Sequence, residues 1–168
     1  GFSNERICEI MGNSCAGIFS GVICIGLARS VSVVLAEGNI LDTIVYGLSI
    51  PLQQIPASVS AVGMIFIQAL LNFFIPSGSG QATVAMPIMA PLSDVIGLTR
   101  QTAVMAFQLG DGLTNLIMPT TGALFVYLGV AKVPYSTYFK WIFPLFLMLI
   151  GIAIVSILIA TFIHLGPF

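Results

Sequence analysis

Charged residues are scarce in this sequence, and their scarcity excludes several classes of protein. Only 7% of the 168 residues are charged, whereas 58% are hydrophobic; a soluble domain carries about 25% charged residues. The chain cannot cover itself with a wetted surface, so we predict an integral membrane protein whose surroundings are the lipid bilayer. With a net charge of −1 and no basic patch, it is expected to have no nucleic-acid partner.

Cysteine and histidine are also few. Cys8, Cys15 and Cys24 form no CxxC pair, and an odd number does not close a disulfide framework, so we interpret them as small packing residues. His164 is the lone histidine, and no metal site is expected beyond a possible Na⁺ site. Because the sequence has no signal-peptide pattern and no initial Met, we expect a piece of a longer protein, or a mature or truncated chain.

Motifs of enzymes are incomplete. The stretch GSGQAT (78–83) begins like GxGxxG but lacks the third glycine and follows no strand. LGDG contains Gly110 and Asp111, but the GxGD signature of intramembrane aspartyl proteases needs a glycine where Gln108 stands. We therefore assign no catalytic residue and do not expect an enzyme.

Uncharged runs predict where the chain crosses the membrane. About 20 apolar residues span a bilayer, so residues 10–36 and 141–165 are predicted transmembrane helices. Gly17 and Gly21 form a GxxxG pair that suits close helix packing. Arg29 either snorkels to the interface or faces the protein interior and pairs with an anion.

Residues 38–56 have a different pattern. Their apolar residues recur with a helical period and are followed by Pro51 and Pro56. This pattern predicts an amphipathic helix that lies in the membrane interface.

No charge occurs between Asp42 and Asp94. Two arms, 57–75 and 81–97, flank the stretch PSGSG at residues 76–80. Two interpretations remain open: a pair of crossing helices joined by a surface turn, or a re-entrant hairpin over 57–97 whose tip stops inside the membrane.

The next predicted span, residues 98–131, is interrupted at 110–121 by glycine, proline and polar residues. Irregular backbone survives at membrane depth only where protein or a watery cavity surrounds it. In transporters, such breaks present helix N-termini to an anionic substrate and unwound carbonyls to a cation such as Na⁺. Two polar interruptions in apolar runs therefore favour a transport site.

Polar side chains in the two interruptions are the first candidates for that site. Asp111 is the only acid well inside a predicted span. It binds a cation, accepts a proton, pairs with a base, or is held by nearby backbone N–H groups. Asn115 lies one turn further on and either accepts from the substrate or caps the broken helix. Hydroxyl ligands for a hard cation come from Ser77, Ser79, Thr120 and Thr121.

Three long stretches carry a resemblance to a known family. They read LLNFFIPSGSGQATVAMPIMAPLSD (70–94), RQTAVMAFQLGDGLTNLIMPTTG (100–122) and LGVAKVPYSTYFKW (128–141). From about residue 10 to 150 the chain resembles the C-terminal half of YfcC-like membrane proteins, which belong with the anaerobic four-carbon dicarboxylate carriers (DcuC family) in the ion transporter superfamily. The chain departs from the family at ARSV (28–31), where an ARG-type sequence is expected.

The resemblance implies an all-α integral membrane fold with transmembrane helices, one re-entrant helical hairpin and one discontinuous helix. This is one inverted repeat of the superfamily fold, so a missing N-terminal repeat would complete the site, and a homodimer is expected. The implied function is ion-coupled secondary active transport, or exchange, of a small carboxylate-bearing metabolite: an amino acid, including a basic one, or a C4-dicarboxylate. The alternative is a structural or channel-like membrane subunit with no substrate cycle.

The same resemblance implies two overlapping sets of site residues. The substrate-binding set is Ser77, Gly78, Ser79, Gly80, Asp111, Asn115, Thr120 and Thr121. The ion-coupling set is Ser79, Gly110, Asp111, Gly112, Pro119 and Thr120, with Na⁺ or a proton as the coupling ion. No other cofactor is expected.

The distribution of basic residues predicts the orientation. Arg6, Lys132 and Lys140 fall on one side of the predicted spans, and Arg100 falls on the other. By the positive-inside rule, the N-terminus of this chain is cytoplasmic and the C-terminus is outside. The expected location is a bacterial-type cytoplasmic (inner) membrane.

Overall fold

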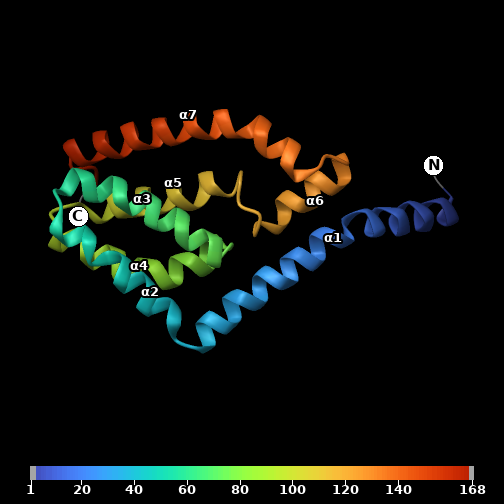
Figure 1. Ribbon diagram of the computed structural model, residues 1–168, viewed down its shortest axis with the longest axis horizontal. Coiled ribbons are helices and arrows are strands. Elements are labelled where there is room, and N and C mark those ends of the chain that lie inside the picture. Colours follow the sequence, from blue (N-terminus) through green and yellow to red (C-terminus); the bar gives the residue numbers. More distant parts are fainter. Residues whose placement is uncertain (1–2, 167–168) are drawn as a thin grey trace.

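The computed structural model describes the backbone of residues 3–166. It also describes the side chains in that range except at positions 17, 18, 20, 21, 24, 25, 28, 29, 31, 32, 41 and 42. Every regular element in the described range is a helix (Figure 1), which confirms the all-α class. The predictions for Gly17 and Gly21, for Cys24 and for Arg29 concern side chains outside the described residues.

The first helix, α1, is longer than predicted and runs over Asn4–Glu37. Ser3 starts it, because its side chain accepts a hydrogen bond from the backbone N–H of Arg6 at 3.3 Å. Figure 1 shows α1 reaching away from the other helices, and it packs mainly against α6 (Gly122–Ala131). Its exposed apolar side chains include Met11, Phe19, Leu27 and Val34. The prediction that 10–36 crosses a membrane stays a prediction.

The segment predicted as one amphipathic helix over 38–56 is divided in two. Helix α2 covers Ile40–Ser49, and a short 3₁₀ helix, η1, covers Pro51–Gln54. Pro51 has no backbone N–H to continue the α-helical bonding. Helix α2 buries Val45 and Ser49 and packs against α4, so one face is apolar as predicted. Its placement in the membrane interface stays a prediction.

The polar stretch that the sequence places at a hairpin tip does join two antiparallel helices. They are α3 (Ala57–Phe74) and α4 (Gly78–Val95). The predicted tip, residues 76–80, is displaced: Gly78 to Gly80 form the first turn of α4, and residues 75–77 make the link. The reason is local, since extended Ser77 is the N-cap and accepts from the N–H of Gly80 at 3.4 Å. Pro87 and Pro91 lie inside α4 without ending it.

The predicted interruption of the next helix is present, but it is shorter than the sequence indicated. Helix α5 runs over Arg100–Thr114, and α6 begins at Gly122. The non-helical segment is therefore 115–121, called the break below, instead of 110–121. Gly110 and Gly112 remain helical, because a helix-interior glycine costs only about 1 kcal/mol and tertiary packing overrides that preference.

The last helix, α7, covers Tyr135–Phe162. It begins six residues before the predicted start at 141, because Pro134 is the N-cap and the helix continues from Tyr135 without interruption. Among the described residues, α3 and α7 are long and apolar enough to cross a membrane. Together with the apolar composition, these helices indicate a membrane protein.

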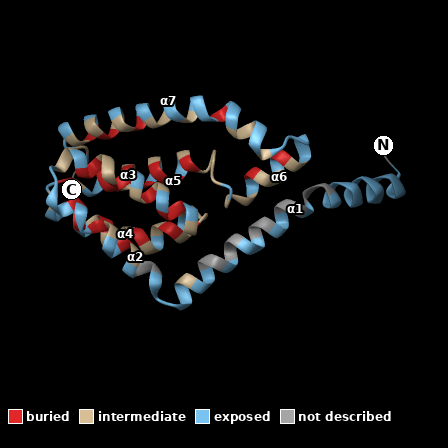
Figure 2. Ribbon diagram, in the orientation of Figure 1, coloured by how far each residue is buried: buried red, intermediate tan, exposed pale blue. Residues whose placement is uncertain are grey.

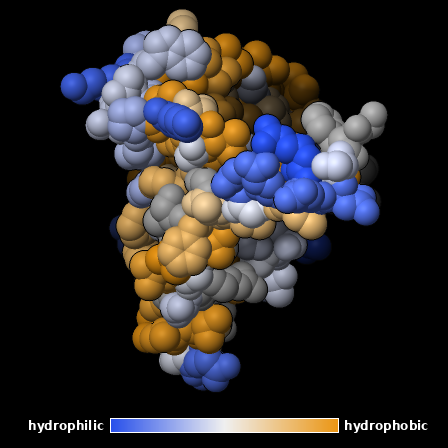
Figure 3. Space-filling model, turned by 90° about the vertical axis from the view of Figure 1, so that its right-hand side faces the viewer, coloured by the Kyte–Doolittle hydropathy of each residue, from blue (hydrophilic) through white to orange (hydrophobic). Residues whose placement is uncertain are grey.

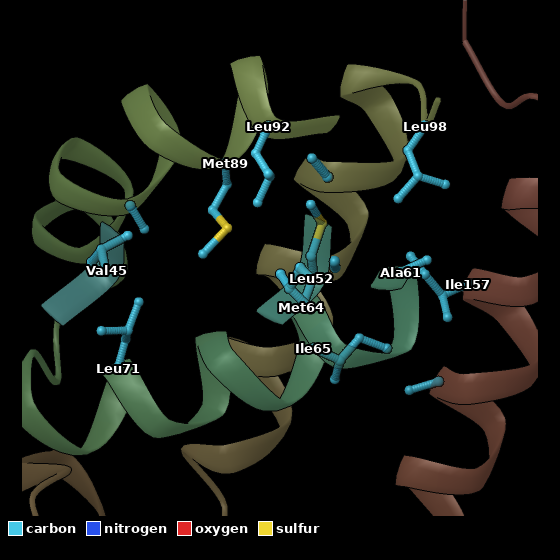
Figure 4. Packing of buried hydrophobic residues seen from close by; sticks show 14 residues of the cluster. Val45, Leu52, Ala61, Met64, Ile65, Leu71, Met89, Leu92, Leu98 and Ile157 are labelled. Atoms are coloured by element: carbon cyan, nitrogen blue, oxygen red, sulfur yellow. The ribbon is translucent and has the colours of Figure 1, made fainter. Parts of the chain in front are cut away.

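The core lies around α3. This helix packs against α5, α4 and α7, and Figure 2 shows buried residues concentrated where these helices face one another. Figure 4 shows Ala61 near the start of α3 beside Ile157 near the end of α7, while Met64, Met89 and Leu92 meet between α3 and α4. The packing therefore fixes the hairpin against α5 and α7.

Candidate functional site

The turn of the hairpin and the break lie beside each other. Figure 1 shows both part-way along α7, with α5 and α6 arranged end to end on either side of the break. Contacts confirm this arrangement, because the side chain of Asn72 in α3 bonds to the end of α5. Residues about 40 positions apart in sequence therefore build one cluster.

Asp111 lies at the centre of the cluster. It is only 7% exposed, and among the described residues it makes no ion pair. Its Oδ1 accepts one long hydrogen bond, from Asn115 Nδ2 at 3.5 Å. A buried carboxylate with so little compensation is costly unless a proton, a cation or a base neutralises it. The buried position of Asp111 agrees with the expectation that it lies inside the protein.

Two glycines let α5 approach the hairpin closely. A Cβ atom on Gly78 would lie 2.9 Å from Asp111 Oδ2, so any side chain there would occupy the space beside the carboxylate. A Cβ on Gly110 would lie 2.5 Å from the carbonyl oxygen of Ile65 and 2.6 Å from Gln68 Cβ. A larger residue at Gly110 would meet backbone atoms of α3, whereas one at Gly78 would displace the Asp111 carboxylate. No local sequence pattern reveals either contact.

Asn115 and Thr121 connect across the break. Asn115 is the C-cap of α5, as one of its two predicted roles requires. Its Oδ1 accepts from Thr121 Oγ1 at 3.0 Å and from Asn72 Nδ2 at 3.1 Å. The hydroxyl of Thr120, which precedes Thr121 in the break, is buried and has no hydrogen-bond partner among the described residues. Buried hydroxyls are nearly always paired, so this oxygen has unused bonding capacity.

Not every predicted site residue belongs to this buried cluster. Gly78, Asp111, Asn115 and Thr121 are brought together by the contacts above, with Gly110 behind them. Ser77 and Gly80 cap and form the first turn of α4. Ser79, Gly112 and Pro119 are exposed beside the cluster.

The structure adds residues that sequence reasoning missed. Asn72 is fully buried in the last turn of α3 and donates to three oxygen atoms at the end of α5. Gln81 Nε2 donates to Gln68 Oε1 at 2.8 Å, which braces α4 against α3. The sequence signal that could have found these residues is an amide side chain within an apolar run, because a buried polar group in a membrane protein has a partner or a function.

Two tyrosines of α7 support the break from outside. Tyr135 donates its hydroxyl to the carbonyl oxygen of Ile117 at 2.6 Å, and Tyr138 donates to that of Leu116 at 3.0 Å. These bonds satisfy carbonyls that have no helical partner. Because the carbonyl oxygens of Leu116 and Ile117 already accept these hydrogen bonds, they are poor candidates for ion coordination.

Comparison with known proteins identifies the family. The family model described as C4-dicarboxylate anaerobic carrier (DcuC) matches residues 4–162. The chain belongs to the DcuC family. The family is one of carriers, which agrees with the prediction that the protein is not an enzyme. No solved structure matches the chain significantly.

Two curated relatives extend this result. The chain is 37% identical to "Putative basic amino acid antiporter YfcC" of Escherichia coli K12 over 123 residues, which are 70% of this chain and 24% of the relative. It is 35% identical to an uncharacterized protein of Haemophilus influenzae over 153 residues, covering 90% of this chain and 30% of the relative. The chain thus spans less than a third of either relative's length.

Proposed function

We propose that the complete protein is an ion-coupled secondary transporter or exchanger of a small carboxylate-bearing metabolite. The chain described here supplies one half of its site, and an N-terminal repeat supplies the other. The observation that carries the proposal is Asp111, a buried acid that forms no ion pair with any described residue, where the hairpin turn meets a broken helix. A proton, Na⁺ or the cationic group of a substrate would each neutralise it.

The position of the hairpin turn part-way along α7 (Figure 1) supports a re-entrant hairpin. Helix α3 has 18 residues and α7 has 28, which correspond to about 27 Å and about 42 Å at 1.5 Å per residue. The start of α3 packs beside the end of α7 (Figure 4). The α4–α5 loop is joined to the same end by the bond from Thr99 Oγ1 to the Leu165 carbonyl at 2.7 Å. The turn at 75–77 therefore stops short of the other end of α7.

The proposed orientation follows the basic residues. Arg6 and Lys132 line one pocket between α1 and α6, so they lie at the same end of the molecule. That end faces the viewer in Figure 3, where hydrophilic side chains gather on part of a surface that is otherwise largely apolar. We place it on the cytoplasmic side of a bacterial inner membrane, which puts the hairpin's open end outside. A homodimer is part of the same proposal.

The substrate class comes from the relatives. The family description points to C4-dicarboxylates, and the name of the Escherichia coli relative points to basic amino acids. Both kinds of substrate carry carboxylates, which suit the N–H groups at the N-terminus of α4. A basic amino acid also carries a cation that suits Asp111.

The test is the substitution Asp111→Asn in the full-length protein reconstituted into proteoliposomes. Uptake of radiolabelled L-arginine, L-lysine and succinate is measured with and without Na⁺ and pH gradients. The matched control is Asp94→Asn, because Asp94 is an exposed acid paired with Arg100 at 2.7 Å at the far end of α4. We expect Asp111→Asn to abolish ion-dependent uptake and Asp94→Asn to retain it. Unchanged uptake and ion dependence in Asp111→Asn would remove the role given to Asp111.

A further inference from the structure

The amide of Asn72 joins the hairpin to the broken helix. Asn72 lies in the last turn of α3 and is fully buried. Its Nδ2 lies 2.8 Å from Thr114 Oγ1, 3.1 Å from the carbonyl oxygen of Asp111 and 3.1 Å from Asn115 Oδ1. An amide nitrogen has two hydrogens, so the three acceptors share them. All three acceptors belong to the end of α5 and the start of the break.

The bonds continue from Asn72 into the candidate site. Asn115 Oδ1 also accepts from Thr121 Oγ1 on the far side of the break, and Asn115 Nδ2 approaches Asp111 Oδ1. Thr114 in turn donates its hydroxyl to the carbonyl of Gly110 at 2.6 Å. A displacement of the Asn72 amide would therefore move Asp111, Asn115 and Thr121 together.

The other end of the Asn72 side chain has no bond. Its Oδ1 is buried and has no hydrogen-bond partner in the described part of the chain. Buried acceptors are nearly always paired, and an unpaired one reduces stability. An apolar residue like its neighbour Leu71 would avoid that loss. Gln81 Oε1 is likewise buried and unpaired among the described residues, so what distinguishes Asn72 is its three bonds to the end of α5.

The second buried amide pair of the hairpin has a different arrangement. Gln81 Nε2 donates to the side-chain and backbone oxygens of Gln68, at 2.8 and 2.9 Å. Both residues belong to the hairpin, so this pair holds α3 and α4 together. Asn72 instead bonds outward, from the hairpin to α5.

We infer that Asn72 is a positioning residue of the proposed transport site. Its amide holds the carbonyl of Asp111 and the side chain of Asn115 in the geometry to which a substrate or ion binds. The same bonds fix the position of the hairpin turn relative to the break. The expected effect of Asn72 on transport rests on the proposed function. The effect of Asn72 on the structure of the break can be measured without transport.

The experiment compares Asn72→Ala with Ser60→Ala in the full-length protein. Ser60 is the matched control, because it is a fully buried polar residue of the same helix whose hydroxyl bonds to the Leu52 carbonyl at 2.7 Å, far from the break. The first readout is backbone amide exchange in lipid nanodiscs. Asn72→Ala is expected to speed exchange over 110–121 while 60–68 stays unchanged, and Ser60→Ala is expected to leave 110–121 unchanged.

The second readout is transport of L-arginine, L-lysine and succinate. Asn72→Ala is expected to raise KM for the transported probe about tenfold or more, the size of effect that supporting residues have on ligand affinity, with little loss of maximal rate. Adding Asn115→Ala to Asn72→Ala is expected to have a smaller effect than the two single effects combined, because both act through one network. Ser60→Ala is expected to leave KM unchanged.

Each outcome decides the inference. Unchanged exchange over 110–121, or a lower maximal rate with unchanged KM, would overturn it and leave Asn72 a packing residue. Faster exchange over 110–121 in Asn72→Ala would support the positioning role even if the unmodified protein transported no probe. The lack of transport would then count against the proposed function alone. If Asn72→Ala does not fold, Asn72→Asp keeps the size but replaces the donor. Normal KM and normal exchange in Asn72→Asp would also overturn the inference.

Discussion

Replacing Gly110 by alanine should push α5 away from α3. The added Cβ would lie 2.5 Å from the Ile65 carbonyl oxygen, 2.6 Å from Gln68 Cβ and 3.1 Å from the Ala69 nitrogen. Ordinary contacts between such atoms begin at about 3.5 Å, so the two helices must separate by about 1 Å. These atoms belong to the backbone and Cβ positions of α3 and cannot rotate out of the way.

The energetic effect has two opposing parts. Overpacking of this kind costs about 1–3 kcal/mol, while alanine in a helix interior gains up to about 1 kcal/mol over glycine. Because the close atoms are held by α3, we expect the clash to dominate and the free energy of unfolding to fall by about 1–2 kcal/mol.

The control for this substitution lies two residues away in the same helix. A Cβ on Gly112 would have no described atom of another segment within 4 Å, so Gly112→Ala should keep the thermal stability of the unmodified protein or raise it slightly. Thermal unfolding of both variants of the full-length protein, purified in detergent, measures the difference. Equal midpoints for Gly110→Ala and Gly112→Ala would refute the close packing of α5 on α3.

Two further predictions concern the edges of the site. Gly78→Ala places a Cβ 2.9 Å from Asp111 Oδ2, whereas at Gly80 the nearest atom to the added Cβ is Ser77 Oγ at 3.3 Å. Uptake assays should therefore show a larger rise in KM for Gly78→Ala than for Gly80→Ala. Equal KM values would place the ligand elsewhere. Tyr135→Phe removes the hydrogen-bond donor to the Ile117 carbonyl and should lower the free energy of unfolding by about 1–3 kcal/mol. Thermal unfolding measures this loss against the control Tyr127→Phe, because the Tyr127 side chain is largely exposed. An unfolding midpoint no lower than that of Tyr127→Phe would contradict the support that α7 gives to the break.

The arrangement of the helices could be predicted to a large extent, because apolar runs and their interruptions are properties of composition. A pair of antiparallel helices, an interrupted helix and a long last helix are present near the predicted positions, while the re-entrant placement of the pair stays a prediction. The boundaries differ where tertiary contacts override local preference. Gly110 suggests an unwound backbone, yet it stays helical because its missing side chain lets α5 approach α3.

The candidate site was predicted only in part. Asp111 and Asn115 were noticed because polar residues are rare in a predicted span. Asn72 was not, since one amide in LLNFF has no motif around it and its three partners lie about 40 residues away. Tyr135 and Tyr138 lie before residue 141, where the last transmembrane helix is predicted to start, and no motif there indicates a site. Their bonds to the break depend on how α7 packs, which no local pattern encodes.

The central claim is that the hairpin turn belongs to a ligand site inside the membrane, and thiol labelling at Ser79 tests it most directly. Cys8, Cys15 and Cys24 are replaced in the full-length protein, uptake is verified, and Ser79→Cys is introduced. A membrane-impermeant thiol reagent is added from each side, with and without Na⁺, L-arginine, L-lysine and succinate. The account predicts labelling from outside that a substrate or ion suppresses. Labelling from the cytoplasmic side alone, unaffected by every ligand, would contradict it and favour a structural subunit with an ordinary loop between two crossing helices.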